Sequence, residues 1–97
     1  MNKDNVRQYL TTKLKATHYQ QVENYTFLYN KEIELVIEDY QDKFIFTPRF
    51  LVNGLFTSHK TTCNKDKCSK KWLYELVEEI LNQLDNIKFI YGDLNNE

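Results

Sequence analysis

The chain has 97 residues, of which 41% are hydrophobic and 14% aromatic, and its formal net charge at pH 7 is −1. This length suits one domain with one core, and the apolar fraction argues against a disordered chain. The near-zero net charge argues against a whole-chain attraction to nucleic acid or to an anionic membrane.

The first residues contain no apolar run of the length that a signal peptide needs. No segment approaches the roughly 20 apolar residues of a membrane-spanning helix. We therefore expect a single cytoplasmic domain over residues 1–97, with residues 93–97 frayed and no cofactor. The frequent Asn, Lys and Ile and the scarce Gly and Pro favour AT-rich codons, which are typical of low-GC bacteria and their phages.

In chain order, the first predicted element is a short helix over residues 3–15. Val6, Leu10 and Leu14 recur at helical spacing, and Asn5 with Gln8 resembles a capping box. The apolar stripe is narrow and the helix is short, so it needs to dock on other elements to be stable.

Side chains then alternate with a period of two, which predicts two β-strands, at residues 22–29 and 32–40. One side of the first strand carries Val22, Thr26 and Leu28. The aliphatic side of the second strand carries Ile33, Leu35 and Ile37, and the two sides together form the predicted core face. A tight turn at Asn30 and Lys31 would then bring the other sides together, with Tyr29 near Glu32, Phe27 near Glu34 and Tyr25 near Val36.

Residues 43–47 are apolar on both sides, as expected of a central strand, and Pro48 marks an edge position, a bulge or a bend. Asn53 and Gly54 form the clearest hairpin signal in the chain. A two-residue turn there would pair Val52 with Leu55 and Phe50 with Thr57, with Leu51 facing Phe56. Residues 61–69 are polar and basic and are expected to form a loop.

The strongest helical pattern follows Ser69, a good N-cap. Its apolar residues fall at successive three- and four-residue steps: Leu73, Leu76, Val77, Ile80, Leu81, Leu84 and Ile87. The tail after this stripe is expected to extend the helix to Gly92 or, as the alternative, to add an edge strand. The predicted fold is α+β, with an N-terminal helix, a four-stranded antiparallel meander, and a long C-terminal amphipathic helix packed on one sheet face.

Three groups of residues are candidates for function. The first is the side of the strands that folding does not require, where aromatic and acidic side chains alternate: Tyr25, Phe27, Tyr29, Glu32, Glu34 and Glu38. Aromatic residues are enriched in protein interfaces, and carboxylates between them would attract a basic partner. This face is therefore expected to bind a protein, either a foreign partner or a second copy of the chain, unless the N-terminal helix covers it.

The second group is a basic loop that would contact phosphates of a nucleic acid: Lys60, Lys65, Lys67, Lys70 and Lys71. The third is a possible zinc-ligand set, His18, His59, Cys63 and Cys68. Its spacing departs from the Cys-x2-Cys pairs of structural zinc sites, so ordinary cysteines or a local disulfide remain alternatives. The chain contains no nucleophile elbow, phosphate-cradling glycine loop or HExxH motif, so we expect no enzyme.

In size, composition and lack of a catalytic motif, the chain resembles the small accessory proteins of phages and mobile elements in low-GC bacteria. Many of those proteins bind and block a host protein, including defence nucleases. The resemblance implies a non-enzymatic protein-binding module, such as an inhibitor, in a bacterial cytoplasm. The alternatives are a nucleic-acid-binding domain and a small zinc-stabilised domain.

Overall fold

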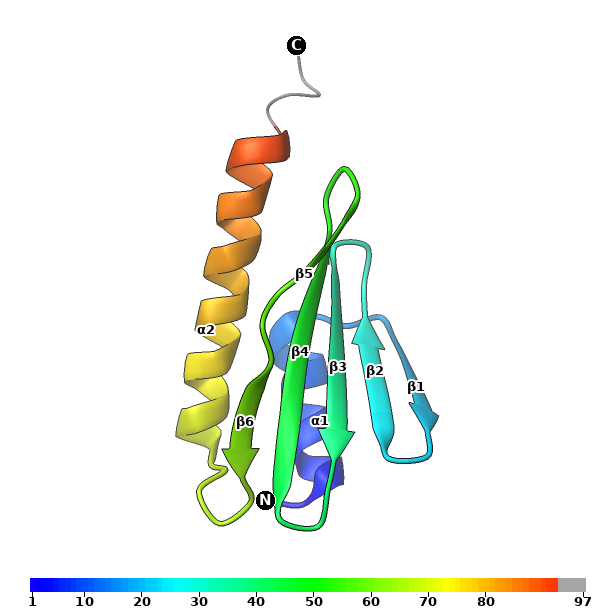
Figure 1. Ribbon diagram of the computed structural model, residues 1–97, viewed down its shortest axis with the longest axis vertical. Coiled ribbons are helices and arrows are strands. Elements are labelled where there is room, and N and C mark those ends of the chain that lie inside the picture. Colours follow the sequence, from blue (N-terminus) through cyan, green and yellow to red (C-terminus); the bar gives the residue numbers. More distant parts are fainter. Residues whose placement is uncertain (93–97) are drawn as a thin grey trace.

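The computed structural model describes residues 1–92 and has the predicted α+β architecture (Figure 1). Its elements, in chain order, are α1 (Lys3–Leu14), β1 (His18–Val22), β2 (Tyr25–Tyr29), β3 (Ile33–Asp39), β4 (Lys43–Leu51), β5 (Leu55–Thr57), β6 (Thr61–Asn64), α2 (Lys70–Ile87) and the π-helical turn η1 (Lys88–Gly92). The predicted extension of the C-terminal helix toward Gly92 is confirmed. The frayed end predicted for residues 93–97 lies outside the described residues.

All strand pairs are antiparallel, and the sheet order is β1-β2-β3-β4-β5, with β6 also paired to β4. The strands β5 and β6 therefore share one edge of β4. Pro48 lies where β4 changes partner, and its carbonyl accepts a hydrogen bond from Ser58 N on that edge. In an antiparallel strand, the N–H and the C=O of one residue point toward the same neighbouring strand. The missing N–H of Pro48 therefore faces the gap between β5 and β6, where no strand is paired with this edge of β4.

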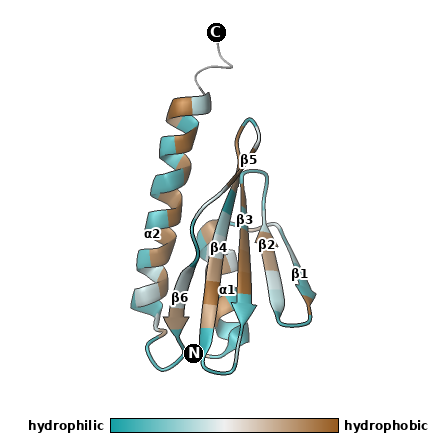
Figure 2. Ribbon diagram, viewed as in Figure 1, coloured by the Kyte–Doolittle hydropathy of each residue, from teal (hydrophilic) through white to brown (hydrophobic). Residues whose placement is uncertain are grey.

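Both helices bury their apolar stripes in one core on one side of the sheet. The inward side chains of the strands include the fully buried Leu35, Phe44 and Phe46. Val6, Leu10 and Leu14 of α1 join this cluster, as do most of the predicted residues of α2. In Figure 1, α1 lies behind the sheet and α2 runs beside β6 and β5. Figure 2 shows that hydrophobic residues (brown) and hydrophilic residues (teal) alternate along α2, as expected of a helix that buries one stripe.

The helix starts are set by side-chain caps. Ser69 accepts a hydrogen bond from Trp72 N at 3.1 Å, as predicted for the start of α2. The predicted capping box at Asn5 is wrong, because the N-cap of α1 is Asn2, whose Oδ1 accepts from Asn5 N at 2.8 Å. Leu81 was predicted to join the α2 stripe, but it is 37% exposed.

The sheet has more strands than the predicted meander. The predicted strand at residues 22–29 is a hairpin of β1 and β2, which turns at Glu23 and Asn24 with Glu23 at φ 53°. Val22 consequently lies opposite Tyr25, on the other side of the sheet from Leu28. The predicted loop at residues 61–69 begins with β6, since backbone pairing with the edge of β4 does not depend on apolar side chains.

The register between β2 and β3 differs from the prediction by two residues. Tyr29 lies opposite Glu34, Phe27 opposite Val36, and Tyr25 opposite Glu38. Asn30 causes the shift, because its N–H bonds Ile33 O and its Oδ1 accepts from the N–H groups of Glu32 and Ile33. The turn therefore falls on Lys31 and Glu32. A shift of two residues leaves the paired side chains of β2 and β3 on their predicted faces.

The hairpin at Asn53 and Gly54 is present, but the register differs by one residue. Leu51 lies opposite Leu55, and Phe50 opposite Phe56, so Val52 joins the turn. Phe56 is thereby placed on the core side, where its ring stacks on Tyr91 with centroids 4.9 Å apart. The one-residue change also moves Leu55 to the opposite side of the sheet.

Candidate functional site

The side of the sheet away from both helices is covered by no other element within residues 1–92, and we call it the open face. The register aligns its side chains in three rows across β2, β3 and β4, namely Tyr25–Glu38–Ile45, Phe27–Val36–Thr47 and Tyr29–Glu34–Arg49. His18, Gln20 and Val22 of β1 continue these rows at the sheet edge. The alternative that the N-terminal helix covers this face does not hold, because α1 packs on the other side with the core.

The aromatic side chains of the open face form ordered contacts with one another. The rings of Tyr25 and Phe27 stack with centroids 6.4 Å apart, and Tyr29 stacks on His18 at 5.4 Å. Tyr25 is 37% exposed, and Phe27 and Tyr29 are half-buried. With Val36 and Ile45 beside them, these residues form a continuous apolar and aromatic area.

The carboxylates of this face are satisfied within the fold. Glu34 Oε1 lies 2.7 Å from an Nη atom of Arg49, which is its neighbour on β4. Glu38 is buried, and its Oε1 accepts a hydrogen bond of 2.7 Å from the Tyr40 hydroxyl. Its other oxygen lies 3.6 Å from Lys60 Nζ. The hydrogen bond to Glu38 raises the pKa of Tyr40 to about 12.

Glu32 does not belong to the open face as predicted. It lies in the β2–β3 turn, and its carboxylate pairs with Lys88 Nζ at 2.9 Å. Arg49, which the sequence reasoning missed, takes a central place instead. Arg49 lies two residues after Thr47 and four after Ile45, and residues at these spacings share one face of a strand. This spacing was the signal that could have placed Arg49 on the open face.

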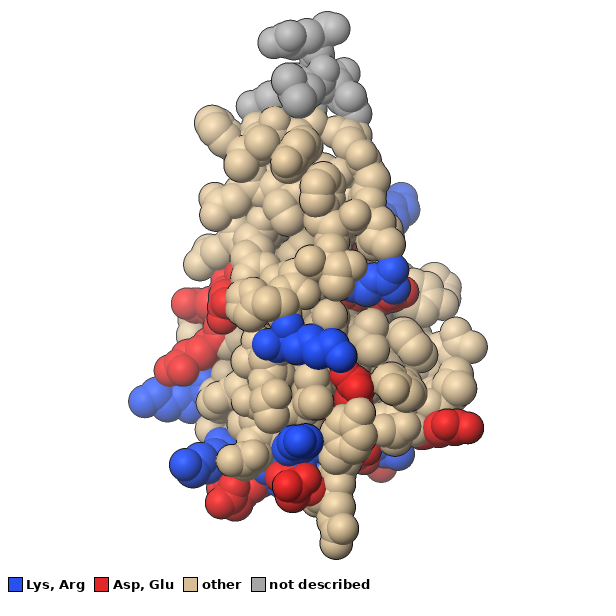
Figure 3. Space-filling model, viewed as in Figure 1, with Lys and Arg blue, Asp and Glu red and all other residues tan. Residues whose placement is uncertain are grey.

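Apolar side chains also gather at the end of the molecule formed by the β4–β5 hairpin and η1. Leu51 and Leu55 are 44% and 50% exposed, and Phe89 and Ile90 of η1 are 75% and 57% exposed. In the view of Figure 3, which looks onto the open face, charged side chains gather over the lower half and this end is nearly free of them.

The basic loop is partly neutralised. Lys60 pairs with Glu38, and Lys65 pairs with Asp39 at 2.6 Å while lying 4.8 Å from the centroid of the Phe44 ring. Lys67, Lys70 and Lys71 have no ion-pair partner among residues 1–92. The structure therefore divides the predicted phosphate-binding group into two lysines that stabilise the fold and three that face solvent.

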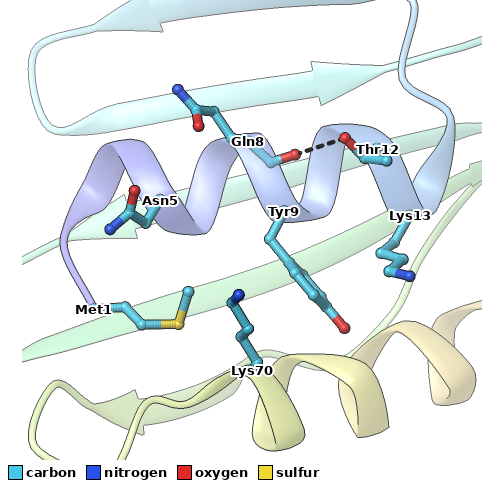
Figure 4. Close-up of a pocket in the computed structure, with 7 residues that line it drawn as sticks. All are labelled: Met1, Asn5, Gln8, Tyr9, Thr12, Lys13 and Lys70. Atoms are coloured by element: carbon cyan, nitrogen blue, oxygen red, sulfur yellow. Dashed lines mark hydrogen bonds between the residues drawn. The ribbon is translucent and has the colours of Figure 1, made fainter.

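A shallow groove of about 540 Å³ separates α1 from the start of α2 (Figure 4). Tyr9 and Lys70 point toward one another across it, and Lys13 lies at its end. The Thr12 hydroxyl is used within α1, where it donates to Gln8 O at 3.1 Å. The groove has donors but no convergent set of buried polar groups, so it does not define a specific ligand.

The four residues of the possible zinc set are not brought together. His18 stacks on Tyr29 at one end of the sheet, whereas His59 lies 3.8 Å from Glu79 beside α2. In the described part of the chain, no group of three or more His, Cys, Asp or Glu side chains is placed to hold a metal ion. Cys63 and Cys68 are buried free thiols, and burial raises the pKa of both, that of Cys63 to about 11.

Comparisons with protein-family models, with curated proteins and with solved structures found no significant match. Over residues 1–92, no helix combines the length and the apolar character that crossing a membrane demands.

Proposed function

We propose that the protein is a non-enzymatic binding module that captures a protein partner on the open face. The observation that carries the proposal is the apolar and aromatic area of Tyr25, Phe27, Tyr29 and Val36, which no element within residues 1–92 covers. Aromatic residues provide large contact areas at low entropic cost, and they are enriched among the residues that dominate binding energies.

The pairing of the carboxylates changes the chemistry expected of the partner. The alternation of Glu with Tyr and Phe predicted a basic partner surface, but Glu34 and Glu38 already have cationic neighbours in the fold. These cations neutralise much of the carboxylate charge within the fold, so Glu34 and Glu38 attract a distant cation only weakly. We propose a partner whose contact surface has an apolar centre with hydrogen-bonding groups around it.

The compositional resemblance to phage and mobile-element accessory proteins supports a host protein as that partner. In this proposal the chain acts in a bacterial cytoplasm and inhibits the protein it captures. The inhibition follows from occlusion, because binding of a whole sheet face covers a comparable area of the partner.

Affinity capture from a bacterial host lysate tests the proposal when three baits are compared. The wild-type chain and Tyr74→Ser should retain the same partner, because Tyr74 is an exposed tyrosine of α2 that lies away from the open face. The double variant Tyr25→Ser/Tyr29→Ser should lose it while keeping the circular dichroism spectrum of the wild type. Hydrogen exchange of the purified complex should show protection in β2 and β3. Capture that persists in the folded double variant would contradict the proposal.

The nucleic-acid alternative rests on Lys67, Lys70 and Lys71, the lysines of the basic loop that have no ion-pair partner within residues 1–92. It predicts affinity that falls steeply as the salt concentration rises, because bound phosphates release counterions. An electrophoretic shift assay at low ionic strength distinguishes it from the open-face proposal, which predicts no shift and no effect of changing these lysines on partner capture.

A further inference from the structure

We propose that the free edge of β1 pairs with β1 of a second copy of the chain, which would join the two sheets into one. This inference does not depend on the open-face proposal. It starts from the position of β1, which is the terminal strand of the sheet and is bonded to β2 along one side only. In Figure 1 no described element lies beyond it.

The two edges of the sheet differ in how they are protected. The edge formed by β5 and β6 is flanked by α2 and η1, since Ser58 Oγ donates to Gln83 Oε1 at 2.9 Å and Phe56 stacks on Tyr91. All residues of β1 are exposed, and the strand contains no Lys, Arg, Asp, Glu or Pro. Charges within the strand, prolines and covering helices are among the means by which proteins keep edge strands apart, and β1 has none of these three.

The edge is also held in a conformation ready for pairing. The Arg7 guanidinium lies 4.5 Å from the centroid of the Tyr19 ring, which attaches the strand to α1. Gln21 accepts a hydrogen bond of 2.9 Å from Thr26, and His18 stacks on Tyr29. Ordering the strand therefore costs little conformational entropy when a partner strand arrives.

A second copy fits this edge because β1 is complementary to itself. Antiparallel pairing about a two-fold axis at Gln20 places the two Gln20 side chains side by side and Tyr19 opposite Gln21 of the other copy. The Gln20 amide makes no hydrogen bond within residues 1–92, so it is available to bond its counterpart.

Charges just outside the strand favour the same arrangement. Lys15 precedes β1 and Glu23 follows it; both are exposed, and neither has an ion-pair partner among residues 1–92. Antiparallel pairing brings the start of each strand to the end of the other, so Lys15 of one copy would approach Glu23 of the second. One pair of strands is a small contact compared with a permanent interface, so we expect reversible, concentration-dependent dimers.

Sedimentation velocity over a wide concentration range tests the pairing. The wild-type chain should shift from monomer to dimer as its concentration rises. The variants Gln20→Lys and Gln20→Glu should each remain monomeric, because like charges would then face one another across the axis. An equal mixture of the two variants should restore the dimer.

The matched control is Gln41→Lys, which adds the same charge at an exposed glutamine in the β3–β4 turn, and it should dimerise like the wild type. Equal melting temperatures would show that the Gln20 variants are folded. The proposal is overturned if the wild-type chain stays monomeric at every concentration, or if its dimer survives both Gln20 variants. A dimer lost only in Tyr25→Ser/Tyr29→Ser would assign self-association to the open face instead.

Discussion

Tyr40 donates its hydroxyl hydrogen to Glu38 across 2.7 Å, and the acceptor carboxylate belongs to a side chain that is only 8% exposed. Glu38 thus lies on the open face without being open to water. A carboxylate removed from water needs such partners, and the Lys60 ammonium at 3.6 Å supplies another. These two contacts explain how Glu38 can lie beside Tyr25 in the sheet with its negative charge paired within the fold.

Tyr40→Phe should lower the stability of the fold at neutral pH, because Glu38 loses its hydroxyl donor. The pKa of Tyr40 is about 12 in the fold and ordinarily 10, so its contribution is fully present below pH 10 and is lost as the pH rises to 12. Urea unfolding between these pH values should therefore show a steeper loss of stability in the wild type than in Tyr40→Phe. Tyr19→Phe, on the helix side of the sheet, is the control and should behave like the wild type. Equal pH dependence in all three proteins would contradict the assignment.

Leu84→Ala and Leu81→Ala make the same chemical change three residues apart on α2. Leu84 is 7% exposed and packs in the core, so its truncation should lower the free energy of unfolding by about 2–4 kcal/mol. Leu81 is 37% exposed, and its truncation should cost less than about 1 kcal/mol. Denaturant titrations measure both values. Similar losses would show that both side chains are buried, as the helical spacing alone predicted.

Glu34 and Arg49 should be energetically coupled. The side chains are 26% and 33% exposed, so we expect a coupling of about 0.5–1 kcal/mol in a double-mutant cycle of Glu34→Gln and Arg49→Met. The coupling should shrink at high salt, which screens partly exposed pairs. Stabilities that simply add would mean that Glu34 is free to meet a partner's cation, and would restore the basic partner expected from the alternating pattern.

Cys63 and Cys68 should resist alkylation in the native protein. Burial raises the pKa of each thiol, so the reactive thiolate is scarce at neutral pH, and the surrounding core limits access. Mass spectrometry after iodoacetamide treatment should find both thiols unmodified in the native protein and modified in urea. Rapid labelling of the native protein at neutral pH would show that this part of the core opens. Elemental analysis of the gently purified protein tests the zinc alternative independently.

Local pattern was sufficient for much of this fold. Apolar spacing placed both helices, and period-two alternation separated the core side of β2 and β3 from the aromatic side. These signals are reliable because each depends only on the geometry of its own element. The same alternation identified the open-face residues of β2, and it identified Glu34, Val36 and Glu38 in β3.

Contacts between elements decided the rest. The side chain of Asn30 bonds the backbone of the turn and of α1, which moves the β2–β3 register, and the packing of Phe56 selects the β4–β5 register. Backbone pairing converts residues 61–64 from a polar loop into a strand. None of these effects depends on the period of the local sequence.

Side-chain periodicity alone is enough to give this chain an aliphatic side that packs in the core and an aromatic and acidic side that the core does not use. Contacts between elements place both helices on the same side of the sheet, pair the acids with Arg49 and Tyr40, and leave β1 unprotected at the end of the sheet. The physical reason is that periodicity describes one element at a time, whereas the pairing of charges and the covering of a face depend on which elements meet.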